Sequence, residues 1–333
     1  MLLTIKNFVF DSDRKNFSEI FNDLSFLKKK KFSTRSYFTS LMYKKSSGNI
    51  RNYIDDKVNT RIRYKYYRAN GKHPILEDKV AFQEHLQANG IPGTNYLAKL
   101  ERGVLTIGDK SFIARDKIKS EIENLANRYE SIFIKPTDGA GGKGIVKLDI
   151  GGGLDTKDLS AKRNYIIEQT LKQHEAVSKI SPHSINTLRV ISVRDGGEIV
   201  IPNCIFRMGI GKSYVDNASS GGIFITYDID TNRLGDTSYQ FFQYGAKSFL
   251  KHPITNFVFK DAPLPFNKEV KDLIKKAAES FKKIDLIGWD VAFTEDGPVL
   301  IEGNDKPHVV GMQITSHGLL SKEVYKKVFN KYL

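Results

Sequence analysis

Residues 131–150 read SIFIKPTDGAGGKGIVKLDI. The first six and the last seven residues of this stretch alternate in polarity and are rich in β-formers, which predicts two strands. Between them, residues 138–144 (DGAGGKG) hold four glycines and a lysine. Glycine backbone N–H groups and a lysine charge can together cradle phosphate oxygens. The stretch therefore predicts two strands joined by a glycine flap that can cover a bound phosphate.

Other glycine loops fit this stretch less well. Residues 139–144 match G-x-G-x-x-G, but a dinucleotide fingerprint needs a following helix, and residues 145–148 are strand-like. A P-loop needs Lys-Ser or Lys-Thr, which is absent here. The protein-kinase loop also matches, with Val146 last, but the sequence has no HRD or DFG triplet. The remaining alternative is an ordinary mobile hairpin turn.

A second chemical signal lies near the C-terminus, in LIGWDVAFTEDGPVLIEGN (residues 286–304). This stretch reads as a hairpin with its turn near Asp296-Gly297. Alternation puts Glu302 and Asn304 on one face of a strand, and the turn brings Asp290 beside them. Two carboxylates and an amide oxygen are hard ligands that suit Mg²⁺. The alternative is a row of solvent-facing polar positions, although an acidic cluster on an apolar sheet is costly without a cation.

Elsewhere, strands come in clusters between helices and not as regular βαβ units, which predicts an α+β fold. A helix is expected to start at Asp78 and to end at Asn89-Gly90. A hairpin is expected at residues 195–197. Further helices are predicted at residues 115–129 and 267–284, and further strands at 96–100, 103–114 and 164–171, with a strand and turn near Asn232.

Composition narrows the classes of protein. The chain has 333 residues, 40% of them apolar, and a single cysteine, Cys204, so a disulfide scaffold is excluded. No apolar run reaches the length of a membrane helix and no secretory signal is evident, so a cytoplasmic location is expected. The formal net charge is +14, and residues 1–70 hold 16 Lys and Arg against 6 Asp and Glu.

The basic N-terminal region has several interpretations. Its charge suits nucleic acid, anionic lipid or a phosphorylated substrate, or simply a solvated face. Residues 51–68 mix tyrosines with basic residues, which is typical of single-stranded nucleic-acid binding and also of an amphipathic helix packed on a domain. The helical interpretation is favoured.

Taken together, the motifs resemble the ATP-grasp superfamily, and most closely its sugar-transfer-associated branch, over residues 78–320. The resemblance implies an α+β ATP-grasp fold in which two subdomains clamp ATP, preceded by a basic helical region. The expected divisions are a basic helical region at 1–75, a pre-ATP-grasp subdomain at 76–115, a small subdomain with the glycine flap at 116–180, and a large subdomain with the metal site at 181–333.

The resemblance also implies roles for individual residues. It implies that ATP is bound by lysines that contact its phosphates, by the glycine flap, by a hinge that contacts the adenine and by an acid that binds the ribose. These ATP-binding residues are Lys79, Lys135, Gly139, Gly141, Gly142, Lys143, Gly144, Glu168, Gln169, Leu171 and Glu175. It assigns Mg²⁺ to Asp290, Glu302 and Asn304, and catalysis to Lys143, Arg189 and Arg207. It assigns the substrate to Asn217, Ser219, Ser220, Gly221, Lys306 and His308, although the loop at 217–222 could equally be a plain turn.

The function that the resemblance implies is that of an ATP-dependent carboxylate–amine ligase with an acyl-phosphate intermediate. It would join an amino acid or amine to a sugar-linked carboxylate or amino sugar in surface polysaccharide (capsule or O-antigen) biosynthesis. Its partners would be small molecules, with a nucleotide- or lipid-linked sugar and peripheral membrane association through the basic region among the options. The alternatives are a small-molecule kinase on the same fold and, third, a nucleic-acid-binding protein, which would leave the acidic hairpin unexplained.

Overall fold

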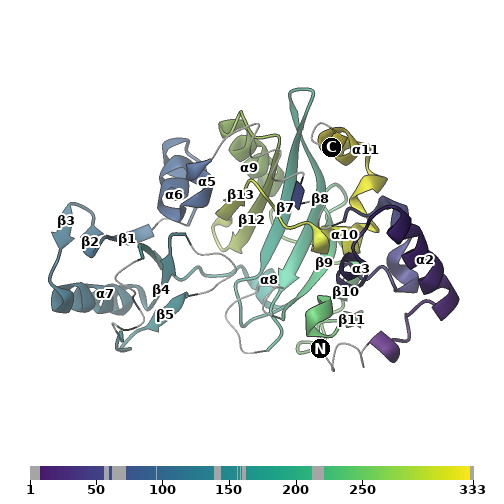
Figure 1. Cartoon of the computed structure of the whole chain (residues 1–333). Coiled ribbons are helices and arrows are strands. Elements are labelled where there is room, and N and C mark those ends of the chain that lie inside the picture. Colours follow the sequence, from purple (N-terminus) through teal and green to yellow (C-terminus); the bar gives the residue numbers. More distant parts are fainter. Residues whose placement is uncertain are drawn as a thin grey trace.

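Two antiparallel sheets form the framework of the molecule (Figure 1). The computed structural model describes most of the chain, but the centre of the glycine flap (139–143) and most of the second glycine loop (212–220) lie outside the described residues. The residues that the structure describes are 8–55, 60–61, 73–94, 96–138, 144–155, 157, 159, 163–211 and 221–330.

The smaller sheet has six strands in the order β3-β2-β1-β6-β4-β5. One face packs against helix α7 (Arg115–Tyr129), whose apolar positions recur every three to four residues. The strands are β1 (Tyr96–Glu101), β2 (Val104–Ile107), β3 (Lys110–Phe112), β4 (Ser131–Pro136), β5 (Val146–Asp149) and β6 (Tyr165–Gln169).

Alternation along β4 determines what the smaller sheet presents on its other face. Ile132 and Ile134 are fully buried and belong to the core beneath α7, together with Ile122. Because successive side chains of a strand point to opposite faces, Phe133 and Lys135 point away from that core. The free face of this sheet therefore carries an aromatic ring and a cation.

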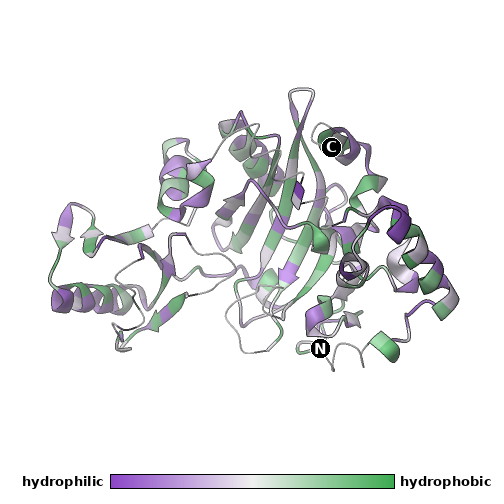
Figure 2. Ribbon diagram, viewed as in Figure 1, coloured by the Kyte–Doolittle hydropathy of each residue, from purple (hydrophilic) through white to green (hydrophobic). Residues whose placement is uncertain are grey.

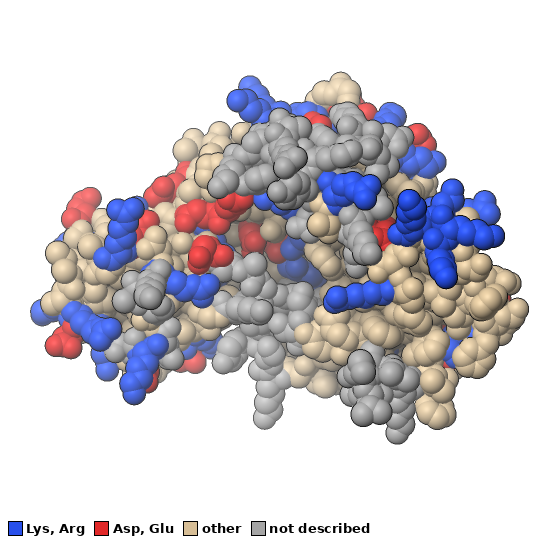
Figure 3. Space-filling model, in the orientation of Figure 1, with Lys and Arg blue, Asp and Glu red and all other residues tan. Residues whose placement is uncertain are grey.

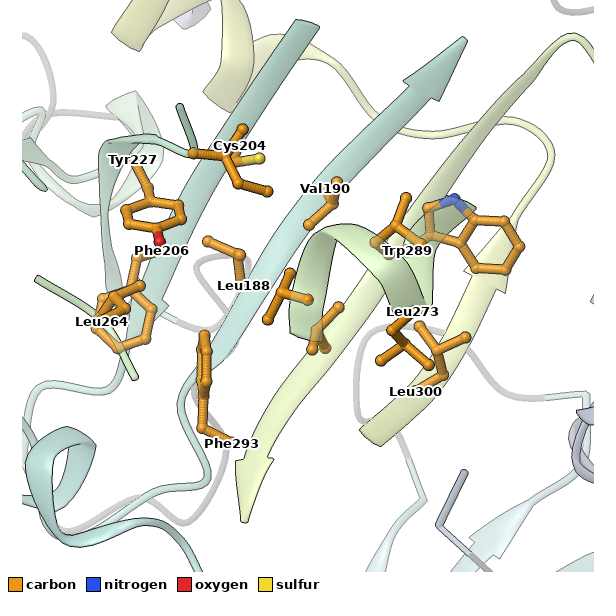
Figure 4. Packing of buried hydrophobic residues seen from close by; sticks show 14 of the residues in the cluster. Leu188, Val190, Cys204, Phe206, Tyr227, Leu264, Leu273, Trp289, Phe293 and Leu300 are labelled. Atoms are coloured by element: carbon orange, nitrogen blue, oxygen red, sulfur yellow. The ribbon is translucent and has the colours of Figure 1, made fainter. Parts of the chain in front are cut away.

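The larger sheet has seven strands in the order β11-β10-β9-β8-β7-β12-β13. Helix α9 (Asn267–Ser280) covers one of its faces, and Figure 4 shows the apolar side chains there, spread across the strands from Tyr227 to Leu300. The strands are β7 (Thr187–Asp195), β8 (Glu198–Met208), β9 (Ile223–Asp228), β10 (Arg233–Tyr239), β11 (Ser248–Phe249), β12 (Leu286–Thr294) and β13 (Gly297–Asn304).

The opposite face of the larger sheet packs against elements from both ends of the chain. Ile191, Ile205 and Phe224 of the sheet share a core with Met312 of α10 and Tyr37 of α3. Hydropathy alternates along the strands accordingly (Figure 2). The helices are α2 (Phe17–Lys29), α3 (Thr34–Thr39), α5 (Pro74–Glu77), α6 (Lys79–Ala88), α8 (Glu175–Ser178), α10 (Val310–Ser316) and α11 (Glu323–Asn330), with short 3₁₀ turns at Lys45–Ser47, Ile50–Asn52, Phe242–Tyr244 and Leu319–Ser321.

The sequence predicted these elements well, and the α+β class is confirmed. The helix at 115–129 is confirmed at both ends, whereas the helix expected at 267–284 ends at Ser280. The extended stretch at 103–114 is a hairpin of two strands, β2 and β3. Asp78 caps α6 by accepting a hydrogen bond from Ala81 N at 3.0 Å, and Gly90 follows the helix with φ +59°.

Strand pairing bears on how the chain divides. Strands β1–β3 pair, through β1 and β6, with the strands of the smaller sheet, so a boundary at residue 115 separates strands that share one sheet. Helix α6 instead packs beside β13 of the larger sheet, where Gln83 Nε2 donates to the Leu300 carbonyl at 3.4 Å.

Most of the basic stretch 51–68 lies outside the described residues, and its expected helix stays a prediction. None of the helices in the described part of the chain combines the length and apolar character needed to span a bilayer.

Gln313 connects the N-terminal segment to α10. Its side chain is fully buried, accepts a hydrogen bond from Ile54 N at 2.6 Å and donates one to Ile54 O at 3.0 Å. Gln313→Ala leaves both buried backbone groups of Ile54 unpaired, so we expect the free energy of unfolding to fall by about 2–4 kcal/mol. Denaturant unfolding measures this, and the exposed Gln243→Ala serves as the control. Equal stability of the two variants would contradict the assignment.

Candidate active site

A cavity of about 120 Å³ lies between the free face of the smaller sheet and the edge of the larger one. It shares three lining residues with a wider groove of about 1160 Å³, and Figure 3 shows a hollow between the two lobes with acidic and basic side chains on its walls. An apolar recess with a few convergent polar groups is the usual form of a small-molecule site. The lining residues are Thr94, Phe133, Lys135, Ile145, Glu168, Gln169, Leu171, Ile185, Thr187 and Ile301.

Lys135 and Glu168 form a buried ion pair in this cavity. They lie on the neighbouring strands β4 and β6, with Lys135 registered against Ile166. The other oxygen of the Glu168 carboxylate accepts a hydrogen bond from the Thr94 hydroxyl. Buried charges are tolerated when they are paired and hydrogen-bonded, so this arrangement holds a cation at the cavity wall without a ligand.

A second charged cluster lies on the larger sheet, beside the cavity. Arg189 Nε donates to Asp290 Oδ1 at 2.5 Å and its Nη2 donates to Oδ2 at 3.0 Å. Arg207 Nη2 lies 3.0 Å from the same Oδ2. Arg207 also donates to the Thr187 hydroxyl, from Nε at 3.0 Å and from Nη2 at 2.5 Å. Because Thr187 lines the cavity, it connects Arg207, and through Asp290 also Arg189, to that space.

Asp290 is ionised in this cluster. Burial would raise the pKa of its carboxyl group, but the guanidinium groups of Arg189 and Arg207 outweigh burial and hold the pKa below its usual value of 3.8. A bidentate arginine supplies the strongest kind of neutral-pH partner for a carboxylate. The sheet therefore presents one carboxylate held between two fixed cations.

The expected metal ligands are brought together in part. Asp290 is paired with Glu302 across β12 and β13, and Asn304 pairs with Gly288 in the same ladder. A bulge between Asp290 and Val291 lets Ile301 reach the cavity while Glu302 stays beside Asp290. Among the described residues, Glu302 has no hydrogen-bond or ion-pair partner.

This donor set fits a hard cation, although Asp290 already has partners. A carboxylate has about four lone-pair positions, and Arg189 and Arg207 occupy three of those of Asp290. One position on Asp290 Oδ1, the Glu302 carboxylate and the Asn304 amide oxygen remain. Within the described part of the chain, no cluster of three or more His, Cys, Asp or Glu side chains could hold a metal ion. The expected set has two carboxylates and one amide, so it is not such a cluster.

The other expected residues lie at several places. Lys79 begins α6, and its backbone N–H donates to Thr137 O at 3.3 Å, which puts this residue where the glycine loop leaves β4. Glu175 is exposed at the start of α8 and pairs with Lys179 at 2.8 Å; this pairing lowers its pKa, and Glu175 does not line the cavity. Lys306 contacts Glu77 at 3.2 Å, and His308 lies beside the Phe241 ring.

The two glycine loops are described only at their ends. Gly144 has φ +75° and a Cβ there would lie 3.2 Å from the Pro136 ring, so this position favours glycine. Gly221 has φ +100° and its carbonyl accepts a hydrogen bond from Gln240 Nε2 at 2.8 Å. The other predicted loop residues lie outside the described residues: Gly139, Gly141, Gly142, Lys143, Asn217, Ser219 and Ser220.

Sequence reasoning missed several residues of this site. Thr94 and Thr187 are single polar residues next to turns, and no local spacing marked them. Phe133, Ile145, Ile185 and Ile301 read as ordinary strand or loop apolar residues. Strand alternation around Lys135 could have indicated Phe133, because residues two apart share a face.

The chain belongs to the sugar-transfer associated ATP-grasp family, whose model matches residues 150–328. The matched segment contains the hinge, the arginines and the acidic hairpin, whereas Lys79, Lys135 and the glycine flap precede it. The family assignment agrees with the arrangement of two antiparallel sheets around a cavity. No curated protein has a sequence that matches this chain significantly.

Several solved structures are similar to the chain at low identity. D-alanyl-alanine synthetase A from Vibrio cholerae is 15% identical with a TM-score of 0.46, over 78% of this chain and 65% of that one. N5-carboxyaminoimidazole ribonucleotide synthetase in an ADP complex is 15% identical with a TM-score of 0.43, over 73% and 50%. Carboxyaminoimidazole ribonucleotide synthase from Aspergillus clavatus with ATP is 16% identical with a TM-score of 0.43, over 74% and 52%. The chain therefore spans between half and two thirds of these proteins.

The charged cluster can be tested by a double-mutant cycle. Asp290→Leu removes the carboxylate that neutralises two arginines and Arg189→Met leaves that carboxylate with one arginine, so each single change is expected to destabilise the protein, by about 3–5 kcal/mol for Asp290→Leu. The double variant should lose about 1–3 kcal/mol less than the sum of the two.

The matched control is the Lys172–Glu295 pair, whose side chains are 82% and 52% exposed at a distance of 3.0 Å. The same cycle there should give a coupling free energy of about 0–1 kcal/mol. Denaturant unfolding measures both cycles. A coupling at Arg189 and Asp290 no larger than that of the control would show that the buried pair is not an energetic unit.

Proposed function

We propose that this protein is an ATP-dependent ligase that activates a carboxylate and joins it to an amine. The observation that carries the proposal is the site's composition in a chain of the ATP-grasp family: a cavity with Lys135 on one wall, next to Arg189, Arg207 and the Asp290–Glu302 pair. The cavity would take the adenine base, and the charged groups beside it would take the phosphates.

Phosphoryl transfer requires positioning and charge stabilisation more than covalent help from the protein. The γ-phosphoryl group would pass to a carboxylate oxygen of the substrate with release of ADP. The amine would then attack the acyl carbon of this acyl phosphate, so that an amide bond forms, phosphate leaves and the amine loses a proton. Fixed cations next to the transferred group lower the barrier because they need no reorganisation as charge develops.

The chain's own residues have distinct parts in this scheme. Arg189 and Arg207 are held by Asp290, so their guanidinium groups are already oriented before phosphate enters. Lys135 is oriented by Glu168 in the same way. The glycine flap would close over the phosphates and keep water from the acyl phosphate.

Magnesium fits at Asp290, Glu302 and Asn304. When bound, it would neutralise phosphate oxygens and align the transferred group. Holding the cation therefore falls to the carboxylates of β12 and β13, while the arginines of β7 and β8 stabilise the phosphates. Glu302 is the more available carboxylate, because Asp290 is shared with two arginines.

The family description supports a sugar-related substrate. We propose that the ligase acts in surface polysaccharide biosynthesis, with a sugar-linked carboxylate or amino sugar and an amino acid or other amine as its substrates. The basic N-terminal fifth of the chain would suit a phosphorylated, nucleotide-linked or lipid-linked sugar.

Lys135→Met tests the nucleotide site. We expect it to weaken ATP binding by roughly 10- to 100-fold, because a hydrogen bond to a charged group contributes about 1.5–3 kcal/mol. Calorimetric titration of the variant with ATP and magnesium measures the loss. Lys99→Met on β1 of the same sheet, outside the cavity, is the matched control. Unchanged affinity in Lys135→Met would remove Lys135 from the site.

ADP release tests the reaction. With ATP, magnesium and a panel of sugar acids, each with and without mixed amino acids, we expect ADP only when carboxylate and amine are both present, together with an amide product by mass. Glu302→Ala should lower the rate by roughly 100-fold or more, because the charge stabilisation it supports is worth several kcal/mol. The exposed Glu198→Ala on β8 should leave the rate unchanged.

Other outcomes of these experiments would contradict the ligase proposal or part of it. A single hydroxylated substrate that gains a stable phosphate would replace the ligase by a kinase on the same fold. Full activity of Glu302→Ala would show that Glu302 is not a ligand of the metal. Absence of ATP binding by the unaltered protein would contradict every ATP-dependent function proposed for it.

A further inference from the structure

An exposed aromatic stripe lies on α2, and a further exposed phenylalanine lies seven residues before this helix. Phe17 and Phe21 are 65% and 72% exposed, and Phe10 is 77% exposed. Scattered single apolar residues are normal on a protein surface, but large aromatic side chains gathered on one segment indicate an interaction site. The stripe lies at the far side of the large sheet from the cavity's small-sheet wall, as Figure 1 shows for α2. It is therefore separate from the nucleotide site.

Helix geometry places a lysine on the same stripe. Residues four and eleven positions apart lie on one side of a helix with 3.6 residues per turn, so Phe17, Phe21 and Lys28 are aligned. The buried face of α2 is formed by Ile20 and Leu27, which pack into the core behind the sheet. The aromatic side chains border this face and stay outside, so folding of the helix does not account for them.

A cation covers one end of the stripe. The Arg14 guanidinium lies 4.2 Å from the centroid of the Phe17 ring. Such stacking fixes the orientation of the Phe17 ring, while Arg14 Nε and Nη1 are themselves buried. The exposed basic charge beside the phenylalanines therefore comes from Lys28 and the lysines that follow it.

The charge on this surface is one-sided. Lys28, Lys29, Lys30 and Lys31 are all exposed, and none of them has an ion-pair partner among the described residues. Of the nearby acidic side chains, Asp23 pairs with Lys15 at 2.8 Å and Asp11 with Lys44 at 2.6 Å. The exposed Glu19 caps the start of α2 by accepting a hydrogen bond from Asn16 N at 2.8 Å, at the opposite end of the helix from Lys28–Lys31. Figure 3 shows basic side chains gathered on the side where Figure 1 places α2.

Helix stability explains only part of this arrangement. Lys28 and Lys29 lie in the last turn of α2, where cations complement the helix dipole. Lys30 and Lys31 follow the helix and gain little from its dipole. The three exposed phenylalanines gain nothing from it.

We propose that this surface, defined by Phe10, Phe17, Phe21 and Lys28–Lys31, docks the protein on a membrane that carries anionic lipid headgroups. The phenylalanines enter the boundary between headgroups and acyl chains, and the lysines contact the negative surface. Aromatic residues with neighbouring lysines are the composition of helices that lie in a bilayer interface.

Other partners fit this surface less well. The core of a protein–protein interface is depleted in lysine, whereas Lys28 lies within the aromatic stripe here. A single-stranded nucleic acid would need a groove that follows its backbone, and neither the cavity nor the wider groove described above is lined by these residues. Docking depends on none of the residues of the nucleotide site, so it stands or falls independently of the proposed ligase activity.

Vesicle co-sedimentation with the full chain tests the proposal. We expect binding to vesicles of equal parts phosphatidylcholine and phosphatidylglycerol, weaker binding to phosphatidylcholine alone, and loss of binding at high salt. Phe17→Ser/Phe21→Ser should weaken binding roughly tenfold or more, because the apolar contribution is lost. Changing Lys28–Lys31 to glutamine should weaken it by a similar or larger factor, roughly tenfold or more.

Two control variants carry the same chemical change elsewhere. Ile113→Ser/Ile150→Ser removes two exposed apolar side chains from the smaller-sheet lobe, where they are 76% and 64% exposed. Glutamine at Lys110, Lys117, Lys282 and Lys283 removes four exposed charges. Both controls should bind vesicles as the unaltered chain does. Circular dichroism and thermal unfolding confirm that all variants fold.

Several results would overturn the proposal. One is no binding to either vesicle, and another is equal loss of binding in the controls. A third is a concentration-dependent dimer by sedimentation that Phe17→Ser/Phe21→Ser abolishes while vesicles are not bound, which would make the surface an interface between copies. A fourth is binding of a single-stranded oligonucleotide, but not of vesicles, that depends on the same phenylalanines.

Discussion

The bidentate contact between Arg189 and Asp290 is the constraint around which the larger sheet and its site are arranged. These residues are registered against each other on β7 and β12, and Arg207 joins them from β8. A carboxylate buried among apolar strands is costly unless it is paired, so the neighbouring strands β8, β7 and β12 must keep this register. The same register puts Leu188 and Val190 on the opposite face, in the core beneath α9. A shift of one residue would bury the charges under that helix and expose the core to the cleft.

The smaller sheet is constrained in the same way, by a buried core on one face and a paired charge on the other. Alternation in β4 gives Ile132 and Ile134 to the α7 core and leaves Lys135 on the cleft face, where Glu168 neutralises it. Each wall of the cleft therefore carries cations that are fixed by a carboxylate on a neighbouring strand. Such groups are held in place by the protein itself, and this pre-organisation is what a phosphate-transferring enzyme requires. In the larger sheet, the side chains that stabilise the strands are also those proposed to meet the substrate.

The sequence predicted local structure better than it predicted this pairing. The helix at 115–129 and the hairpins around Gly196 and Gly297 follow from local periodicity and turn residues, and the structure has them there. The contact between Asp290 and Arg189 joins residues 101 positions apart, so no local spacing could reveal it. Asp290 was expected to act with Glu302 and Asn304 on the hairpin, and the structure does pair Asp290 with Glu302 across β12 and β13. What the alternation argument could not show is that β7 lies on the other side of β12, with β8 beside it, so that Arg189 of β7 and Arg207 of β8 reach the same carboxylate. Thr94 and Thr187 were missed for the same reason, because their importance comes only from strands and turns that meet in space.

Charge balance explains how such a site can be stable and, under the proposed function, accept a nucleotide. Asp290 and Glu302 together offset Arg189 and Arg207, and Glu168 offsets Lys135, so the walls of the cleft are close to neutral. Under the proposed function, phosphate oxygens would share the arginines and a divalent cation would share the carboxylates. The existing ion pairs would then be redistributed without any buried charge being left alone, which avoids the largest cost of placing a charged ligand in a low-dielectric cleft. A phosphate entering without a cation would leave both carboxylates beside new negative charge. Under the proposed function, the arrangement of β7, β8, β12 and β13 would therefore favour the nucleotide and the metal as a pair over either one separately.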